Sequence, residues 1–198
     1  MTARWSSCTV DLPNPEQWLP IDLGPRAPED WAVTTAARAM GAGAPPEFVT
    51  AMAEDLAWYR AVASNRRAVL AAGYRTGALE PVIAFLHVAG IEAPEGGGVV
   101  AELERTFRSP RPYVLGPTDV STVRLGAGTA VRVRELAGSP ADSTSAEVME
   151  YVTHYVVPEG IGGTVIEVTL TWGSLALGPE FSELADAVAG SLTVTVAG

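Results

Sequence analysis

The feature that most constrains this fold is the alternation of apolar and polar residues along the second half of the chain. A period of two indicates β-strands, because successive side chains of a strand point to opposite faces of a sheet. The turns between the segments are short and contain glycine or proline, so neighbouring strands are expected to be antiparallel. The alternating segments are VSTVRL (120–125), GTAVRVREL (128–136), EVMEYVTHYVV (147–157) and TVIEVTLTW (164–172), with turns at 126–128, 138–145 and 158–163.

Helical patterns occupy the first half of the chain and return near its end. Pro28 to Asp30 predict the start of a helix through residue 40, since proline and acidic residues favour the first turn. A second helix is expected from Pro45 through Ala72, with Gly73 as its C-cap. The remaining predicted elements are extended pieces within 5–23, a buried strand at 81–91, helices at 99–107 and from Pro179, and a last strand at 191–196.

Helices before the strands and a helix–strand ending indicate an α+β fold. We expect an antiparallel sheet that is covered by helices on at least one face. No convincing linker separates two domains, so the prediction is one domain over residues 1–198. Within it, residues 1–78 hold the N-terminal extended segment and helices, and residues 79–198 form a sheet-rich part with a C-terminal helix.

The charge composition excludes several classes of function. The chain has 198 residues and a formal net charge of −10, which repels nucleic-acid backbones and anionic membranes. All 13 basic residues are arginine, so a Walker-type lysine and a Schiff-base lysine are both absent. The single Cys8 leaves no internal disulfide and no cysteine-cluster metal site.

The chain is predicted to be cytoplasmic, without cofactor, metal or nucleic acid. Its N-terminus lacks the layout of a signal peptide, and no apolar run reaches the roughly 18 residues of a membrane helix. The expected partner is a protein of unidentified kind, and a homodimer is left open.

The hairpin at 151–172 contains the candidate site residues. His154 lies mid-strand among valines, where a histidine with one hydrogen-bond partner is expected to be structural. It is also the candidate general base of a hydrolase, with Glu150 or Glu167 as its orienting carboxylate. Alternatively, His154, Tyr155 and Trp172 lie near the wall of an apolar ligand pocket between sheet and helices.

Two further predictions concern the arginines. Arg105, Arg108 and Arg111 are the one basic concentration, which could receive a small anion or an acidic partner segment or could offset neighbouring carboxylates. In the strands, the face with Ile166 and Val168 is expected to be buried. The opposite face is expected to carry Arg132, Arg134 and Glu167 as cross-strand charge partners.

Three segments carry a resemblance to a known family. The runs "VRLGAGTAVRVRE", "YVTHYVVPEGIGGTVIEVTLTW" and "FSELADAVAGSLTV" resemble uncharacterised actinobacterial proteins with a PsbP-like (Mog-like) fold. The resemblance covers residues 80–198. It implies an α/β/α sandwich on a curved antiparallel sheet, in a fold whose relatives are mostly binding or assembly modules.

The functional hypothesis is therefore a non-catalytic protein-binding or chaperone-like adaptor, not an enzyme. A connection with a secretion system follows only by analogy with relatives of the fold. The alternatives are a small-molecule-binding domain with an apolar pocket and, as a third hypothesis, the hydrolase that uses His154.

Overall fold

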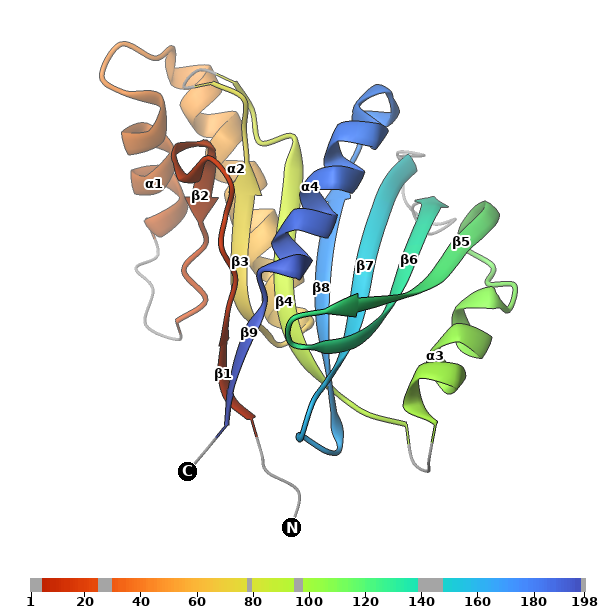
Figure 1. Cartoon of the computed structure of the whole chain (residues 1–198). Coiled ribbons are helices and arrows are strands. Elements are labelled where there is room, and N and C mark those ends of the chain that lie inside the picture. Colours follow the sequence, from red (N-terminus) through yellow and green to blue (C-terminus); the bar gives the residue numbers. More distant parts are fainter. Residues whose placement is uncertain (1–4, 25–29, 78–79, 95–97, 139–147, 197–198) are drawn as a thin grey trace. The chain divides into compact units, whose positions relative to one another are not determined.

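The computed structural model describes residues 5–24, 30–77, 80–94, 98–138 and 148–196. The fold is α+β, with curved antiparallel sheet strands flanked by helices (Figure 1), as the sequence predicts. The chain divides into two compact units, Asn14–Ala89 and the combination of Met1–Pro13 with Gly90–Gly198. The predicted starts at Pro28 and Glu29, and most of the turn at 138–145, lie outside the described residues.

The unit of residues 14–89 packs two helices with short antiparallel strands. Its helices are α1 (Trp31–Met40) and α2 (Pro46–Asn65), and its strands follow the order β2 (Trp18–Pro20), β3 (Ala68–Tyr74) and β4 (Ala84–Glu92). A short 3-10 helix, Pro15–Gln17, precedes β2. Met52, Leu56 and Phe85 are among the large side chains in its core, and each is at most 1% exposed.

The sequence prediction for residues 66–73 was wrong. The second helix ends at Asn65 rather than Ala72, because Arg67 takes a left-handed backbone conformation (φ 54°) that reverses the chain. Residues 68–74 then form β3, which pairs with both β2 and β4. Gly73 is not a C-cap but a strand residue, where a Cβ would lie 2.8 Å from a methyl carbon of Val82. Tertiary pairing thus overrides the helix propensity of an alanine-rich segment.

The other unit is built on a four-stranded antiparallel meander in the order β5-β6-β7-β8. These strands are β5 (Val114–Leu125), β6 (Gly128–Gly138), β7 (Val148–Pro158) and β8 (Thr164–Trp172). The predicted strands and their antiparallel pairing are confirmed, although β5 begins six residues before the predicted start. A register shift between Leu115 and Asp119 explains why the alternation is lost there.

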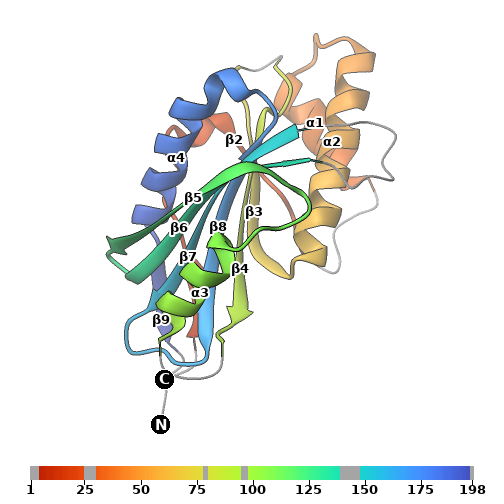
Figure 2. The ribbon, with the colours of Figure 1, turned by 90° about the vertical axis from the view of Figure 1, so that its right-hand side faces the viewer.

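Helices cover both faces of this meander. Phe107 of α3 (Val99–Arg108) stacks on Tyr155, while Asp186 of α4 (Gly178–Gly190) contacts His154. Because Tyr155 and His154 are adjacent in β7, they point to opposite faces, so α3 and α4 lie on opposite sides. Figures 1 and 2 show α4 against β7 and β8, and α3 beside β5 and β6.

The two ends of the chain meet in a separate two-stranded ribbon. β1 (Trp5–Thr9) pairs antiparallel with β9 (Thr193–Val196). The predicted last strand is therefore present, but it does not join the meander. Asp11 and Ser191 extend this connection, since the Asp11 N–H donates to the Ser191 hydroxyl oxygen at 2.8 Å. A 3-10 turn, Leu175–Leu177, leads into α4.

Candidate functional site

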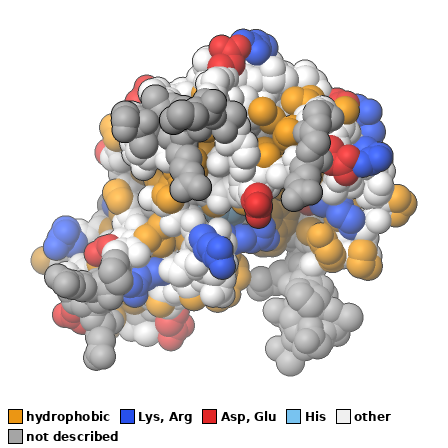
Figure 3. All heavy atoms as spheres, turned by 90° about the horizontal axis from the view of Figure 1, so that it is seen from below, with side chains coloured by type: hydrophobic (Ala, Val, Ile, Leu, Met, Phe, Trp, Pro, Cys, Tyr) orange, Lys and Arg blue, Asp and Glu red, His pale blue; other side chains and the backbone are white. Residues whose placement is uncertain are grey.

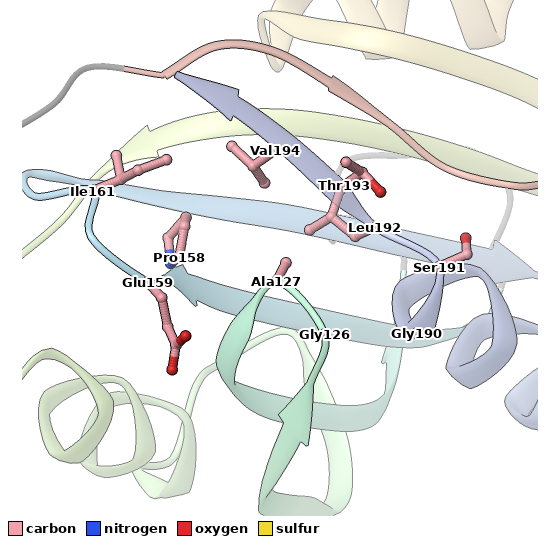
Figure 4. A pocket seen from close by; sticks show the side chains of 10 residues that line it. All are labelled: Gly126, Ala127, Pro158, Glu159, Ile161, Gly190, Ser191, Leu192, Thr193 and Val194. Carbon is pink, nitrogen blue, oxygen red and sulfur yellow. The ribbon is translucent and has the colours of Figure 1, made fainter. Parts of the chain in front are cut away.

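A pocket of about 470 Å³ opens in the larger unit, where two hairpin turns approach the end of α4. Three segments line it: the turn Gly126–Ala127, the turn from Pro158 to Ile161, and residues 190–194 at the junction of α4 and β9 (Figure 4). Its volume lies within the roughly 300–1,000 Å³ that is usual for small-molecule sites. The pocket is therefore large enough for a compact ligand.

Glycines allow the two turns to approach each other. The backbone N–H of Glu159 donates to the carbonyl of Ala127 at 3.1 Å, which joins the turns. At Gly128 a Cβ would lie 2.1 Å from the carbonyl oxygen of Val157, so no other residue fits there without displacing a strand. Gly160 has φ 72°, a conformation that glycine adopts without strain. The turn glycines thus bring together the two turns that line the pocket.

The side chains around the pocket are mostly apolar, but the surface it exposes is divided about evenly between polar and apolar atoms. Ile161 and Leu192 are 7% and 3% exposed, and Pro158 is also buried. Figure 4 shows the side chains of Ala127, Pro158 and Val194 converging, while the Glu159 carboxylate points away. Apolar side chains with a few polar groups at the rim are the usual lining of a small-molecule site.

The electrostatic environment of the pocket disfavours anions. Gly190, the last residue of α4, lines it, and a helix C-terminus carries a partial negative charge of about half an electron. At the rim, Glu159 forms an ion pair with Arg124, so that arginine is already engaged with a carboxylate. The net charge of −10 acts in the same direction.

His154 lies in a polar cluster beneath α4. Its Nε2 is 3.0 Å from Asp186 Oδ1, and the same oxygen accepts from Arg132 Nε at 2.7 Å. Arg132 Nη2 also donates to the Ser182 hydroxyl at 2.6 Å. Ser182 and Asp186 are one helical turn apart on α4, so this cluster fastens the helix to β6 and β7. His154 is 1% exposed, and its Nδ1 has no hydrogen-bond partner among the described residues.

The charge of Asp186 is favoured by its neighbours. Partial burial raises the pKa of Asp186. The hydrogen bonds from His154 and Arg132 and the charges of both side chains together lower the pKa by more, so that it lies below its usual value. Asp186 is therefore the carboxylate that orients His154. The sequence pointed to Glu150 and Glu167 instead, because a helix 32 residues further along the chain gave no signal of its packing.

Glu150 fastens the other end of the same helix. It binds Arg134 through Oε1, with Arg134 Nε at 2.6 Å, and accepts from the Trp172 indole N–H through Oε2 at 3.1 Å. The carboxylate also lies against Gly178, the first residue of α4, where a Cβ would be 2.7 Å from Glu150 Oε2. A carboxylate at this position is favoured by the positive end of the helix dipole.

The predicted arrangement of charges on the strands was wrong in one respect. In the strand register, Arg132 of β6 lies directly opposite His154 of β7, which in turn lies opposite Val168 of β8. Arg132 and Arg134 are therefore on the face of Val168, and not on that of Glu167. Both faces are buried by helices, so arginines lie among the aliphatic residues beneath α4. Glu167 is on the other face, where it accepts from the Thr169 hydroxyl at 3.1 Å.

The structure separates the residues predicted for a ligand wall. His154 and Trp172 share the face beneath α4, and Trp172 is 0% exposed. Tyr155 lies on the opposite face and stacks on Phe107 with ring centroids 4.4 Å apart. None of the three lines the pocket at the hairpin turns. The sequence identified those turns but gave no sign that they would meet β9.

Each arginine of the predicted patch is paired with a carboxylate. Arg105 binds Glu102, Arg108 binds Glu104 at 3.4 Å, and Arg111 binds Glu135. Arg111 also lies over the Phe107 ring, 5.0 Å from its centroid. On the face drawn in Figure 3, basic and acidic side chains are interspersed with apolar ones. This arrangement matches the interpretation that the arginines offset neighbouring carboxylates.

The described residues contain neither a metal-type cluster of side chains nor a helix of membrane-spanning character. No group of three or more His, Cys, Asp or Glu side chains there could hold a metal ion. Within the same residues, no helix is long and apolar enough to cross a membrane.

Among solved structures, the chain is similar to LpqN, which is involved in cell envelope biogenesis of Mycobacterium tuberculosis. The TM-score is 0.51 at 15% sequence identity, and the match covers 96% of this chain and 84% of LpqN. No known family and no curated protein matches the sequence. At this identity the likeness shows the fold alone.

Proposed function

We propose that this chain is a non-catalytic binding module whose pocket takes a compact apolar ligand with a neutral or cationic polar end. The observation that carries the proposal is the 470 Å³ pocket lined by Pro158, Ile161 and Leu192. The ligand's charge follows from the C-terminus of α4 and from the acidic rim, both of which disfavour an anion. The pocket differs from the predicted one in position, since it lies at the turns rather than beside His154.

The test compares three probes that share an octyl chain: 1-octanol, octylammonium and octanoate. Binding is followed by the amide shifts of Ala127, Ile161 and Leu192 in ¹H–¹⁵N NMR spectra. We expect saturable shifts with 1-octanol and octylammonium, and at least about tenfold weaker binding of octanoate, a difference of about 1.4 kcal/mol. If no probe shifts these amides, the proposal fails.

Ala127→Trp is the variant that fills the pocket, because the Ala127 side chain points into it. Ala187→Trp adds the same group at an exposed position of α4 outside the pocket lining, and serves as the matched control. We expect the first variant to lose probe binding and the second to keep it. Equal binding by both variants would place the ligand elsewhere.

The absence of catalysis is tested separately. The clusters around His154 and Glu150 bind α4 to the sheet, which supports a structural role for both. A panel of p-nitrophenyl esters, assayed with wild type, His154→Gln and Ser182→Ala, examines the hydrolase alternative. Ester hydrolysis by the wild type that both variants lose would overturn the non-catalytic proposal.

A second candidate is a protein-binding or chaperone-like adaptor. It is supported by exposed apolar side chains in residues 14–89, chiefly Trp58 at 58% and Phe48 at 49% exposure. Exposed tryptophan is typical of interface hot spots. The fold likeness to LpqN supports placing such an adaptor in cell envelope biogenesis. Affinity capture with wild type and Trp58→Ser tests it: a stoichiometric partner that the variant loses is expected.

A further inference from the structure

We propose that β5 pairs with the β5 strand of a second copy of this chain, so that the meander continues across a two-fold axis near Thr122. Within the described residues β5 has one neighbouring strand, β6, and its other side is an edge. An edge strand presents unpaired backbone N–H and C=O groups, which are a template for another strand. The proposal does not depend on the pocket.

The hairpin geometry identifies the outward backbone groups. Gly126 and Ala127 form a two-residue turn between Leu125 and Gly128, and the residues that flank such a turn face each other through their backbone groups. Alternation then turns the backbone groups of Val120, Thr122 and Arg124 away from β6. A side-chain contact agrees with this assignment, since Arg108 Nη2 lies 3.4 Å from the Val120 carbonyl oxygen.

Residues 120–125 form a regular edge that is suited to pairing. The register shift and Gly116, with φ 76°, lie before them and leave this stretch in continuous pairing with β6. Val120, Thr122 and Val123 are β-branched, which favours strands. Proline and lysine, which often protect natural edges, do not occur in the stretch.

Charge complementarity favours a second copy as the occupant. Glu104 of α3 accepts from the Thr122 hydroxyl at 2.6 Å, so its carboxylate lies over the middle of the edge. In an antiparallel pairing about Thr122, the second copy's Arg124 comes opposite Val120, on the same face as Glu104. Arg124 pairs with Glu159 in its own chain, so Glu104 of the other copy would be a second carboxylate on the same guanidinium, and the two-fold axis produces this contact twice. Three facing pairs would exchange backbone hydrogen bonds.

Sedimentation equilibrium of the full chain over about 10 μM to 1 mM tests the proposal. The buffer contains about 0.15 M NaCl, at which the Debye length is about 8 Å. Salt at this concentration screens the long-range repulsion between two acidic molecules more than it screens ion pairs in direct contact. We expect the mass to rise with concentration from 20.6 kDa towards twice that value. A mass that stays at 20.6 kDa over the whole range would overturn the proposal.

Thr122→Pro removes an outward N–H and tolerates an edge position, so the variant is expected to be monomeric with an unchanged circular dichroism spectrum. Should that variant fail to fold, Arg124→Glu replaces it as the test and should weaken dimerisation at least tenfold. Combining Arg124→Glu with Glu104→Arg should restore association. A dimer that persists in a folded Thr122→Pro or in Arg124→Glu would show that another surface associates. Unchanged probe binding in Thr122→Pro, whose residue lies outside the pocket lining, separates this proposal from that of the pocket.

Discussion

Replacing Gly128 by alanine should destabilise the protein by about 2–4 kcal/mol. The added Cβ would lie 2.1 Å from the Val157 carbonyl oxygen and 3.1 Å from the Pro158 Cα, both of which are backbone atoms. Since backbone cannot rotate away as a side chain can, β6 must move from β7. The backbone at Gly128, with φ 156°, adds strain of about 1–3 kcal/mol for a residue with a side chain.

Gly126→Ala in the same turn is the matched control. No atom lies within 4 Å of its Cβ position, and Gly126 has no positive φ. Alanine should therefore stabilise the protein by about 0.4–1 kcal/mol, because it reduces the conformational entropy of the unfolded chain. Urea unfolding followed by circular dichroism measures both changes. For a chain of this length, 2–4 kcal/mol corresponds to a fall in Tm of roughly 4–16 °C. A Gly128→Ala loss below about 1 kcal/mol would refute the steric reasoning.

Two further predictions concern the attachment of α4. Gly178→Ala should destabilise the protein by about 1–2 kcal/mol, because the added Cβ displaces the buried Glu150 carboxylate, and this outweighs the helix propensity of alanine. Gly190→Ala is the control: no atom lies within 4 Å of its Cβ position, so it should leave stability unchanged or raise it in the same urea assay. The pKa of Asp186 is lower in the folded than in the unfolded state. Its contribution to the free energy of unfolding is therefore fully present above the unfolded-state pKa of about 3.9 and is lost as the pH falls through the folded-state pKa. The stability difference between wild type and Asp186→Asn should therefore shrink from pH 7 to pH 2; a difference that stays constant would contradict the assigned pKa shift.

The strands of the meander could be predicted because their signal is local. Alternation in 128–136 and 164–172 depends only on neighbouring residues, and glycine at 126–128 and 158–163 terminates each pattern. The segment 68–74 could not be assigned in the same way. Its alanines fit a helix or a buried strand equally well, and the left-handed position is occupied by Arg67 rather than by a glycine or asparagine that would reveal it.

The candidate sites show the same division. The sequence predicted a structural role for His154 and, in the hydrolase alternative, Glu150 or Glu167 as its carboxylate. The carboxylate that contacts His154 is Asp186 on α4. The sequence also placed Arg132 on an open face, because a strand covered by helices on both sides has no polar side to distinguish. The register of β6 against β7 and the position of α4 settle which residues meet.

The sequence by itself thus determined an α+β chain, an antiparallel meander and the glycine turns that join its strands, since each of these follows from the conformational preferences of adjacent residues. Only the tertiary structure decided that the turns at 126–127 and 158–161 meet residues 190–194 around a pocket. It also decided that Glu150 and His154 hold α4. These contacts join residues up to about 70 positions apart, and they depend on register and packing that no local pattern encodes.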